Sequence, residues 1–226
     1  MLFDLHMHSR YSVDALTKPE TIIKICKANG WSFSLTDHNH MHAYTKGKVM
    51  QKAKKAGVFM IPGEEIKVIN EAGEVEGEIL AYFLHKEILP TTFENILDEV
   101  KKQDAMMACP HPFDWPRKMF KRFPKEWKHF DAMEVYNARA YYQGLNKEAQ
   151  EFYESTAHKK LACLADSDAH TPEEVGNGLT DIPAHNEDEF RRAIKKKLTT
   201  PIPRGKANFW HHFQTQMARR HWMKER

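Results

Sequence analysis

The first eight residues place an aspartate and two histidines, Asp4, His6 and His8, at alternate positions. Apolar and polar residues alternate through this stretch, which predicts a β-strand, and alternate side chains of a strand share one face. Two histidines spaced in this way can hold one metal ion, with Asp4 behind them to orient an imidazole. The opening strand is therefore a candidate metal-binding strand.

Further side chains that can bind a metal follow the ends of the later predicted strands. The complete set is His6, His8, Asp14, Asp37, His38, Glu64 or Glu65, His111, Asp168 and His170. Imidazole and carboxylate together suit Zn²⁺, Mn²⁺ or Fe²⁺ better than Mg²⁺ or Ca²⁺, which prefer oxygen ligands. Because the set is too large for one tetrahedral ion, it predicts two or three divalent metal ions that share a bridging carboxylate.

The elements that must position these residues are short apolar strands that alternate with helices. Helices are predicted near residues 18–29, 44–56, 92–103, 146–158 and 188–197, and strands near 31–35, 58–61, 65–69, 79–84, 105–109, 133–136 and 161–165. The strand near residue 60 is expected to break at Pro62-Gly63. This alternation is typical of parallel βα units. Polar clusters at the strand ends are typical of an α/β barrel, which carries its active site there.

Composition indicates the class of protein. The chain has 226 residues, 41% of them hydrophobic, which suits one domain with its own core. No stretch approaches the roughly 18 apolar residues that span a bilayer, and no secretory leader opens the chain. Cys26, Cys109 and Cys163 are far apart, which favours buried thiols over a disulfide framework. We therefore expect no membrane span and a cytoplasmic location.

Charge is distributed unevenly along the chain. Residues 204–226 carry six Lys/Arg against one acid, a net charge of +5, which leaves −2 for residues 1–203 because the whole chain carries +3. We therefore expect a barrel domain over residues 1–203 and a basic C-terminal tail over residues 204–226.

The tail has the spacing of a helix with one apolar face. Phe209, Phe213 and Met217 recur every four residues. The favoured interpretation is that this face docks on the barrel. The alternative is a nucleic-acid or membrane surface, because Trp210 and Trp222 accompany the basic residues.

Six ordered motifs resemble those of a known family. They are DLHMHS, the aspartate six residues after His8, TDHN, PGEE, CPHP and SDAH, and they span residues 4–170, with GNG at 176–178 as a further match. In type and order they resemble the motifs of the PHP (polymerase and histidinol phosphatase) family. The resemblance implies an α/β fold, a distorted TIM-like (β/α)7 barrel in a single domain, with two or three metals that hydrolyse phosphoesters.

The resemblance also implies how the ligands are divided. His6, His8 and Asp168 would bind the first metal, Glu65 would bridge to a second metal bound by His111, and Asp14, His38 and His170 would surround the third. Glu65 is preferred to Glu64 because the family places this carboxylate two residues after a glycine, here Gly63. Asp37 is expected to join the catalytic machinery by orienting His38 or a strand end.

The sequence departs from the family at two positions. Many members carry a metal-binding histidine on the strand after the bridging glutamate, where this chain has Glu78. Carboxylate replaces imidazole readily, so we expect Glu78 to be a ligand. His85 is the other candidate, although it lies past the strand. Asp166 stands where the family usually has glycine, and it either supports a ligand or is solvated.

The function that follows is that of a metal-dependent phosphoesterase acting through hydroxide formed at the metals. Its expected substrate is a small phosphorylated metabolite, a nucleotide or an oligonucleotide. The runner-up is a histidinol phosphate phosphatase, and the alternative outside enzymes is a non-catalytic metal-binding PHP module. Arg139 follows a predicted strand and is the expected phosphate clamp, and His170 joins it in the catalytic set. The alternative for Arg139 is an exposed salt bridge with Glu134 or a helix acid.

Two segments beside the motifs carry further polar and aromatic residues. Residues 114–130 mix six Lys/Arg with five aromatic residues directly after CPHP. This composition suits a nucleotide or a single strand bound over the site and, equally, a surface segment with its aromatics packed on the barrel. His40 and His42 follow TDHN, and we interpret them as polar surface rather than as an extension of the cluster.

Overall fold

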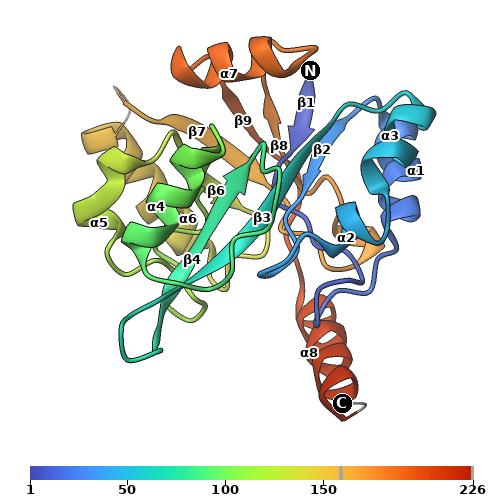
Figure 1. Cartoon of the computed structure of the whole chain (residues 1–226), viewed down its shortest axis with the longest axis horizontal. Coiled ribbons are helices and arrows are strands. Elements are labelled where there is room, and N and C mark those ends of the chain that lie inside the picture. The colour runs from blue at the N-terminus through green and yellow to red at the C-terminus, as the bar shows by residue number, and fades with distance from the viewer. Residues whose placement is uncertain (158–159, 225–226) are drawn as a thin grey trace.

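The computed structural model describes residues 1–157 and 160–224, with side chains described up to residue 220. In this part of the chain a single mixed sheet of nine strands, in the order β7-β6-β5-β4-β3-β2-β1-β8-β9, forms a nearly closed barrel. The strands are β1 (Leu2–Asp4), β2 (Ser32–Leu35), β3 (Met60–Ile69), β4 (Val75–Tyr82), β5 (Met106–Cys109), β6 (Ala132–Asn137), β7 (Ala162–Asp166), β8 (Gly178–Asp181) and β9 (Thr200–Pro203). Figure 1 shows the helices arranged around the sheet, except the C-terminal helix, which extends away from it.

Six of these strands form two parallel groups. β1, β2 and β3 pair in parallel, as do β5, β6 and β7, and β4 lies antiparallel between the two groups. β8 and β9 extend the sheet beyond β1 in antiparallel pairing. β7 approaches β8, where the Ala165 amide donates to Thr180 Oγ1 at 2.9 Å. The parallel strands therefore present their carboxyl ends at one end of the barrel, together with the start of β4.

Helices cover the sheet between the strands. They are α1 (Pro19–Asn29), α2 (His42–Thr45), α3 (Val49–Ala56), α4 (Phe93–Lys102), α5 (Phe123–Glu126), α6 (Gln143–Phe152), α7 (Glu187–Lys195) and α8 (Phe209–Lys224). Pro19 stands in the first turn of α1, Gly30 ends the helix with φ of 70°, and Ile22 lies on its buried side. In Figure 1, α7 lies at one end of the molecule and α8 projects from the other, toward which β1 runs.

One apolar cluster joins the sheet to α7. Leu5, Leu80 and Leu164 are fully buried and cluster with Phe190 and Ile194 of α7. Burying a side chain of this size contributes about 1.5–3 kcal/mol. Because Leu5 directly precedes the first histidine of the candidate site, this packing fixes the backbone from which that histidine extends.

Two predicted elements are divided differently in the structure. The helix predicted at residues 44–56 is two helices, α2 and α3, separated at Gly47 and Lys48. A side chain at Gly47 would meet the Ala43 carbonyl oxygen at 2.5 Å, and Lys48 has φ of 50°, so the chain turns here. The strand predicted to break at Pro62 continues through it as β3. Pro62 has no N–H to donate, but its carbonyl oxygen accepts a hydrogen bond from the Phe83 amide at 2.6 Å.

The sequence does not predict β8 and β9. Both are four residues long, and β9 contains Pro201 and Pro203, which only an edge strand tolerates well. The predicted distorted α/β barrel in a single domain is therefore confirmed, and its described sheet is mixed, with nine strands. The helix predicted at residues 146–158 begins earlier, at Gln143, and continues as a π-helical turn at Tyr153–Ala157. Its predicted end, His158, lies outside the described residues.

The tail forms the predicted helix, but the face expected to dock is exposed. Phe209 is 81% exposed, Phe213 43% and Met217 47%. Thr215 on the opposite side is only 4% exposed, and its hydroxyl accepts a hydrogen bond from Arg139 Nη2 at 3.1 Å. The prediction of apolar docking is therefore wrong: the barrel offers a cation at this place, and the helix turns its polar side toward it.

The alternative interpretation of the tail depends partly on residues that are not described. The side chain of Trp222 lies outside the described part of the chain, as do residues 225 and 226. None of the described helices is both long enough and apolar enough to cross a bilayer.

Candidate metal centre

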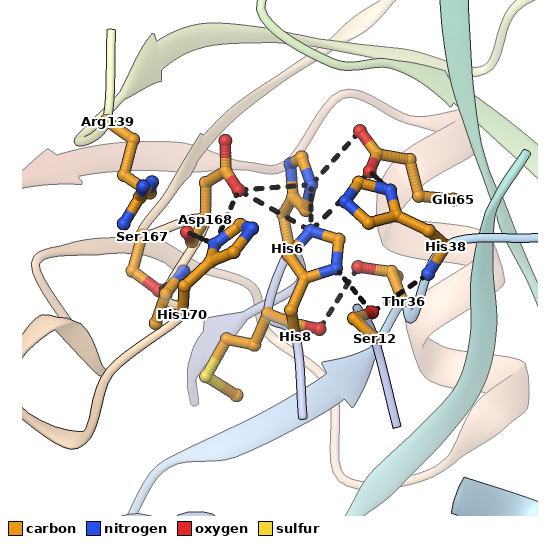
Figure 2. A network of polar contacts seen from close by, with 12 residues as sticks. His6, His8, Ser12, Thr36, His38, Glu65, Arg139, Ser167, Asp168 and His170 are labelled. Carbon is orange, nitrogen blue, oxygen red and sulfur yellow. Dashed lines mark hydrogen bonds and ion pairs between the residues drawn. The ribbon is translucent and has the colours of Figure 1, made fainter. Parts of the chain in front are cut away.

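The predicted ligands converge where the parallel strands end. His6 and His8 follow β1, His38 follows β2, Glu65 lies within β3, His111 follows β5, and Asp168 and His170 follow β7. Isolated bridges join Met7 to Ala169 and His38 to Glu65, which holds neighbouring strand ends together. Figure 2 shows the imidazoles of His6, His8, His38 and His170 pointing toward the carboxylates of Glu65 and Asp168. Four groups of three such residues have ligand atoms within 4.8 Å of one another.

His6, His8 and Asp168 form the first of these groups. The Nε2 atoms of the two histidines face each other at 3.1 Å. Asp168 Oδ1 lies 3.6 Å from His6 Nε2 and 3.5 Å from His8 Nε2. None of the three residues is more than 2% exposed. Three buried ligand atoms directed at one point suit a divalent ion.

Glu65 lies between this group and two others. Its Oε1 is 3.4 Å from both His6 Nε2 and His111 Nε2, and its Oε2 is 2.7 Å from His38 Nδ1. A carboxylate whose two oxygens face different imidazoles has the geometry of a bridge between two ions.

His8, His38 and His170 form another of these groups, and Asp14 lies beside it. Asp14 Oδ1 lies 3.5 Å from His38 Nε2 and 3.6 Å from His170 Nε2. The centroid of the His8 ring is 4.3 Å from the centroids of both the His38 and the His170 rings. A loop delivers Asp14, whereas the strand ends deliver the imidazoles.

The geometry separates two pairs of alternatives that the sequence leaves open. Glu64 points to the opposite face of β3, where its Oε2 accepts a hydrogen bond from the Ile88 amide at 2.8 Å. Glu78 lies near the start of the antiparallel strand β4, and its Oε1 is 3.9 Å from His38 Nδ1. His85 follows the end of β4, at the other end of the barrel, and is exposed. The cluster therefore contains Glu78 and neither Glu64 nor His85.

Glu134 of β6 supports the ligands from behind, a role that the sequence does not assign to it. Its Oε1 lies 2.7 Å from His6 Nδ1, and its Oε2 accepts from the His111 amide at 2.7 Å and from Asn137 Nδ2 at 2.8 Å. A carboxylate on the remote ring nitrogen fixes the tautomer and the orientation of a ligating imidazole. The sequence feature that could have indicated this role is an acidic residue between two apolar ones, Met133 and Val135, within a predicted strand.

Asp4 was predicted for that supporting position, and this prediction is wrong. Its carboxylate instead accepts hydrogen bonds from the Ser167 amide at 3.1 Å and the Gly176 amide at 3.0 Å. Asp166 is buried rather than solvated, and its Oδ1 accepts from the Leu5 amide at 2.7 Å. Burial raises the pKa of Asp4 to about 7, and burial followed by neighbouring carboxylates raises the pKa of Asp166 well above its usual value.

Asp37 holds the loop after β1 rather than facing the cavity. It accepts hydrogen bonds from the Ser9 amide and hydroxyl, both at 2.7 Å, and from the Ser12 hydroxyl at 2.9 Å. The Ser12 hydroxyl in turn accepts from the His38 amide at 3.0 Å. Asp37 is therefore placed to orient His38 through Ser12.

Arg139 is buried at the edge of the site. It is 5% exposed and donates from Nη1 to Glu174 Oε1 and from Nη2 to Thr215 Oγ1. Its acidic partner is therefore Glu174 rather than Glu134, and the pair is not an exposed surface bridge. The guanidinium lines the cavity over the ligands.

The segment 114–130 reaches the site through two cations. Arg117 donates to Asp168 Oδ2 at 2.5 Å, and Lys118 Nζ lies 3.2 Å from Glu78 Oε1. Gly77 permits this approach, because a Cβ at this position would lie 2.2 Å from the Phe120 Cα.

The aromatic residues of the same segment serve mainly the core. Phe120, Phe123 and Phe130 are buried in an apolar cluster, whereas Trp115 is 67% exposed. Most of the aromatic residues therefore pack on the barrel, as one of the two interpretations expects. The cations Arg117 and Lys118 lie over the site, as the other interpretation expects.

His40 and His42 lie beside the cluster without joining it. Their rings stack with centroids 4.3 Å apart, and His40 Nε2 lies 3.0 Å from the Tyr11 carbonyl oxygen. Neither belongs to a metal-binding group among the described residues.

Burial and charge oppose each other inside the cluster. Burial disfavours a charge on His6, yet neighbouring carboxylates raise its pKa well above the usual value. Burial also disfavours ionisation of Glu65, yet His38 and His6 hold its pKa well below the usual value. For His170, burial and then the charge of Arg139 lower the pKa, which favours the neutral imidazole that binds metals.

Several buried atoms of the cluster lack hydrogen-bond partners among the described residues. They include Asp14 Oδ1 and His111 Nδ1, whereas His38 Nδ1 and Glu65 Oε2 face each other at 2.7 Å. Buried polar atoms without partners are rare in folded proteins. Nitrogen and oxygen atoms that converge in this way fit divalent Zn, Mn or Fe.

A cavity of about 360 Å³ lies over the ligands. Seven candidate ligands form its floor, namely Asp14, His38, Glu65, Glu78, His111, Asp168 and His170. Its wall comes from the segment 114–130, from the loop after β6 and from α8. The polar wall residues include Arg117, Lys118, Arg139, His212, Gln216 and Arg219.

Comparison with known proteins gives both a family and structural relatives. The family model of the PHP domain matches residues 4–207. The uncharacterized protein MJ0417 of Methanocaldococcus jannaschii is 31% identical over 185 residues, which cover 78% of this chain and 68% of that protein.

Two solved structures share the fold. A two-domain protein from Bacteroides vulgatus, described as containing a predicted PHP-like metal-dependent phosphoesterase, has a TM-score of 0.70 at 22% identity, covering 90% of this chain and 65% of that chain. The lesion-specific endonuclease PfuEndoQ from Pyrococcus furiosus has a TM-score of 0.58 at 17% identity, covering 87% and 56%. The chain thus spans less than two thirds of either structure.

Proposed function

The chain belongs to the PHP domain family, and on that premise we propose that it is a hydrolase, a metal-dependent phosphoesterase. The observation that carries this proposal is the convergence of imidazoles and carboxylates from five strand ends on the floor of one cavity. Two or three divalent ions bound there would act as Lewis acids toward a phosphate ester and activate water.

The proposed roles follow the distances. His6, His8 and Asp168 would hold one ion, Glu65 would bridge to an ion at His111, and Asp14, His38 and His170 would hold a third, with Glu78 beside His38. Arg139 would bind a phosphate oxygen, because its three hydrogen bonds to described residues leave further N–H groups of the guanidinium. Asp37 and Glu134 would act as positioning residues.

The burial of most aromatics in residues 114–130 supports a small phosphorylated molecule or a nucleotide over a long single strand. Histidinol phosphate is one such molecule, and an oligonucleotide belongs in the test because one relative in fold is an endonuclease. The free, buried thiols of Cys26, Cys109 and Cys163 support a cytoplasmic location.

The test is hydrolysis by the full chain loaded with Mn²⁺, Zn²⁺ or Fe²⁺. The panel contains an aryl phosphate, a diaryl phosphate, histidinol phosphate, mononucleotides and short oligonucleotides. Glu65→Gln should lower kcat/KM about 10²–10³-fold, since it removes the charge of the bridging carboxylate.

Glu64→Gln is the matched control. It alters the adjacent glutamate on the opposite face of β3, where burial raises the pKa of Glu64 to about 8, so that the native side chain is already neutral at pH 7. Its turnover should stay near that of the parent. Undiminished turnover in Glu65→Gln would refute the assignment, and two or more bound ions without hydrolysis of any substrate would favour a non-catalytic module.

A further inference from the structure

A second cavity, of about 380 Å³, adjoins the cavity over the ligands and shares with it Lys118, Arg219 and the candidate ligands Asp14 and His38. Four of its lining side chains are cationic, namely Arg10, Lys67, Lys118 and Arg219. Asp14 is the one carboxylate among its described lining residues. We call these four cations and the space between them the cationic pocket.

The four cations come from four separate parts of the chain. Arg10 lies in the loop after β1, Lys67 in β3, Lys118 in the segment after β5 and Arg219 in α8. The fold, rather than a run of basic sequence, therefore gathers them beside the candidate ligands. Like charges held together in a partly enclosed space repel one another, and a bound anion relieves that repulsion.

The pocket has more positive charge than its neighbours neutralise. Lys118 Nζ lies 3.2 Å from Glu78 Oε1. For Arg10, Lys67 and Arg219, no ion pair is found with any carboxylate whose position the structure describes. At least three positive charges are therefore available to a ligand.

Hydrogen bonds hold α8 against the site, so the position of Arg219 is determined by the fold. The Ala207 amide donates to the Ala138 carbonyl oxygen at 2.8 Å, just before the helix begins. Arg139 Nη2 donates to Thr215 Oγ1 at 3.1 Å within it. Arg219 stands four residues after Thr215, on the same side of the helix, and lines both cavities.

We propose that the cationic pocket binds a second phosphate group of the substrate while the phosphoester to be cleaved lies over the candidate ligands. This inference rests on the proposed phosphoesterase function and defines its substrate class as one that carries two phosphates. A phosphate carries about −1.5 to −2 charges at pH 7 and has several acceptor oxygens, which matches several cations better than a carboxylate does. A guanidinium such as that of Arg219 can contact two of those oxygens.

The first experiment measures binding rather than turnover. Isothermal titration of the metal-loaded full chain compares an alkyl monophosphonate with alkyl diphosphonates of two to five linking carbons, none of which can be hydrolysed. The second phosphonate should improve affinity about tenfold or more for at least one linker, as one charge-assisted contact would. Arg219→Gln and Lys67→Gln should each abolish most of that gain.

Arg220→Gln is the matched control for this titration. Arg220 is the exposed neighbour of Arg219 and does not line either cavity, so the gain should persist. Absence of a gain in the parent protein, or a gain that survives in both Arg219→Gln and Lys67→Gln, would overturn the proposal.

The second experiment identifies the source of the second phosphate. Values of kcat/KM are compared for a hexose monophosphate and bisphosphate, and for a dinucleotide with and without a terminal phosphate. A preference of about tenfold or more in either pair, reduced in Arg219→Gln, supports the proposal and names the source. No preference in either pair, with hydrolysis intact, refutes it. A diphosphonate gain without hydrolysis of any ester supports the pocket and counts against the proposed function.

Discussion

The floor and the wall of the candidate site are built in different ways. The floor consists of buried side chains within or just after the strands, such as Glu65 and Asp168, which are at most 2% exposed. The wall consists of a long segment and the C-terminal helix, and its cations Lys118 and Arg219 are partly or largely open to solvent. Buried ligands on rigid strands suit chemistry that needs fixed geometry, whereas exposed cations on a loop and a terminal helix suit recognition that varies between proteins.

If the floor depends on fixed geometry, loss of a contact that supports a ligand should strongly weaken metal binding. Glu134→Gln removes the charge that faces His6 Nδ1 at 2.7 Å. Metal affinity should fall about 10–100-fold, measured by titration against a chromophoric chelator. Glu154→Gln, at an exposed position in the π-helical turn, is the control. Equal affinities in the two variants would mean that the floor does not need this support.

The wall should respond to pH through His212 of α8. Burial and then Arg139 lower the pKa of His212 to about 4, below the ordinary value near 6.5. Released from the barrel, the imidazole takes up a proton more readily than when docked. Docking of α8 should therefore be complete above about pH 6.5 and weaken progressively as the pH falls toward 4.

Hydrogen exchange of residues 207–216, compared at pH 7 and pH 5 as protection factors, measures this effect. His212→Gln should remove most of the difference between the two pH values. An identical pH dependence in the variant would show that a group other than His212 causes the effect. Equal protection of the parent protein at both pH values would contradict the predicted weakening of α8 docking.

The exposed apolar face of α8, on the outer side of the wall, should contribute least to the stability of the protein. Phe209→Ser alters a side chain that is 81% exposed, so the free energy of unfolding should change by less than about 0.5 kcal/mol. Phe190→Ala, which truncates a ring of α7 that is 1% exposed, should cost about 3–5 kcal/mol. Denaturant unfolding of both variants measures the contrast. A comparable loss in Phe209→Ser would restore the prediction that the apolar face of α8 docks.

The sequence predicts features that depend on neighbouring residues and not those that depend on contacts between distant residues. The alternation along β1 and the i, i+2 spacing of Asp168 and His170 are local features, so they place these side chains at strand ends without knowledge of the rest of the fold. The supporting role of Glu134 is not predicted from the sequence, because its partner His6 is 128 residues away. Likewise, the apolar spacing of α8 shows a helix but not which side meets the barrel. That choice depends on Arg139, a distant donor whose hydrogen bond Thr215 can accept.

The strands follow the same rule. Elements with strong local patterns, such as α1 and β2, agree with the prediction within a residue or two. β9 does not, because the prolines at 201 and 203 disfavour a strand locally and only its pairing with β8 makes it one.

The central claim, that the floor is a multinuclear metal site, is tested most directly by counting metals. Plasma mass spectrometry of the purified full chain, produced with Mn²⁺, Fe²⁺ and Zn²⁺ supplied, should find at least two divalent ions per chain. The count should fall in His6→Ala, while Glu64→Gln keeps it. Fewer than two ions per folded parent chain under these conditions would contradict the account.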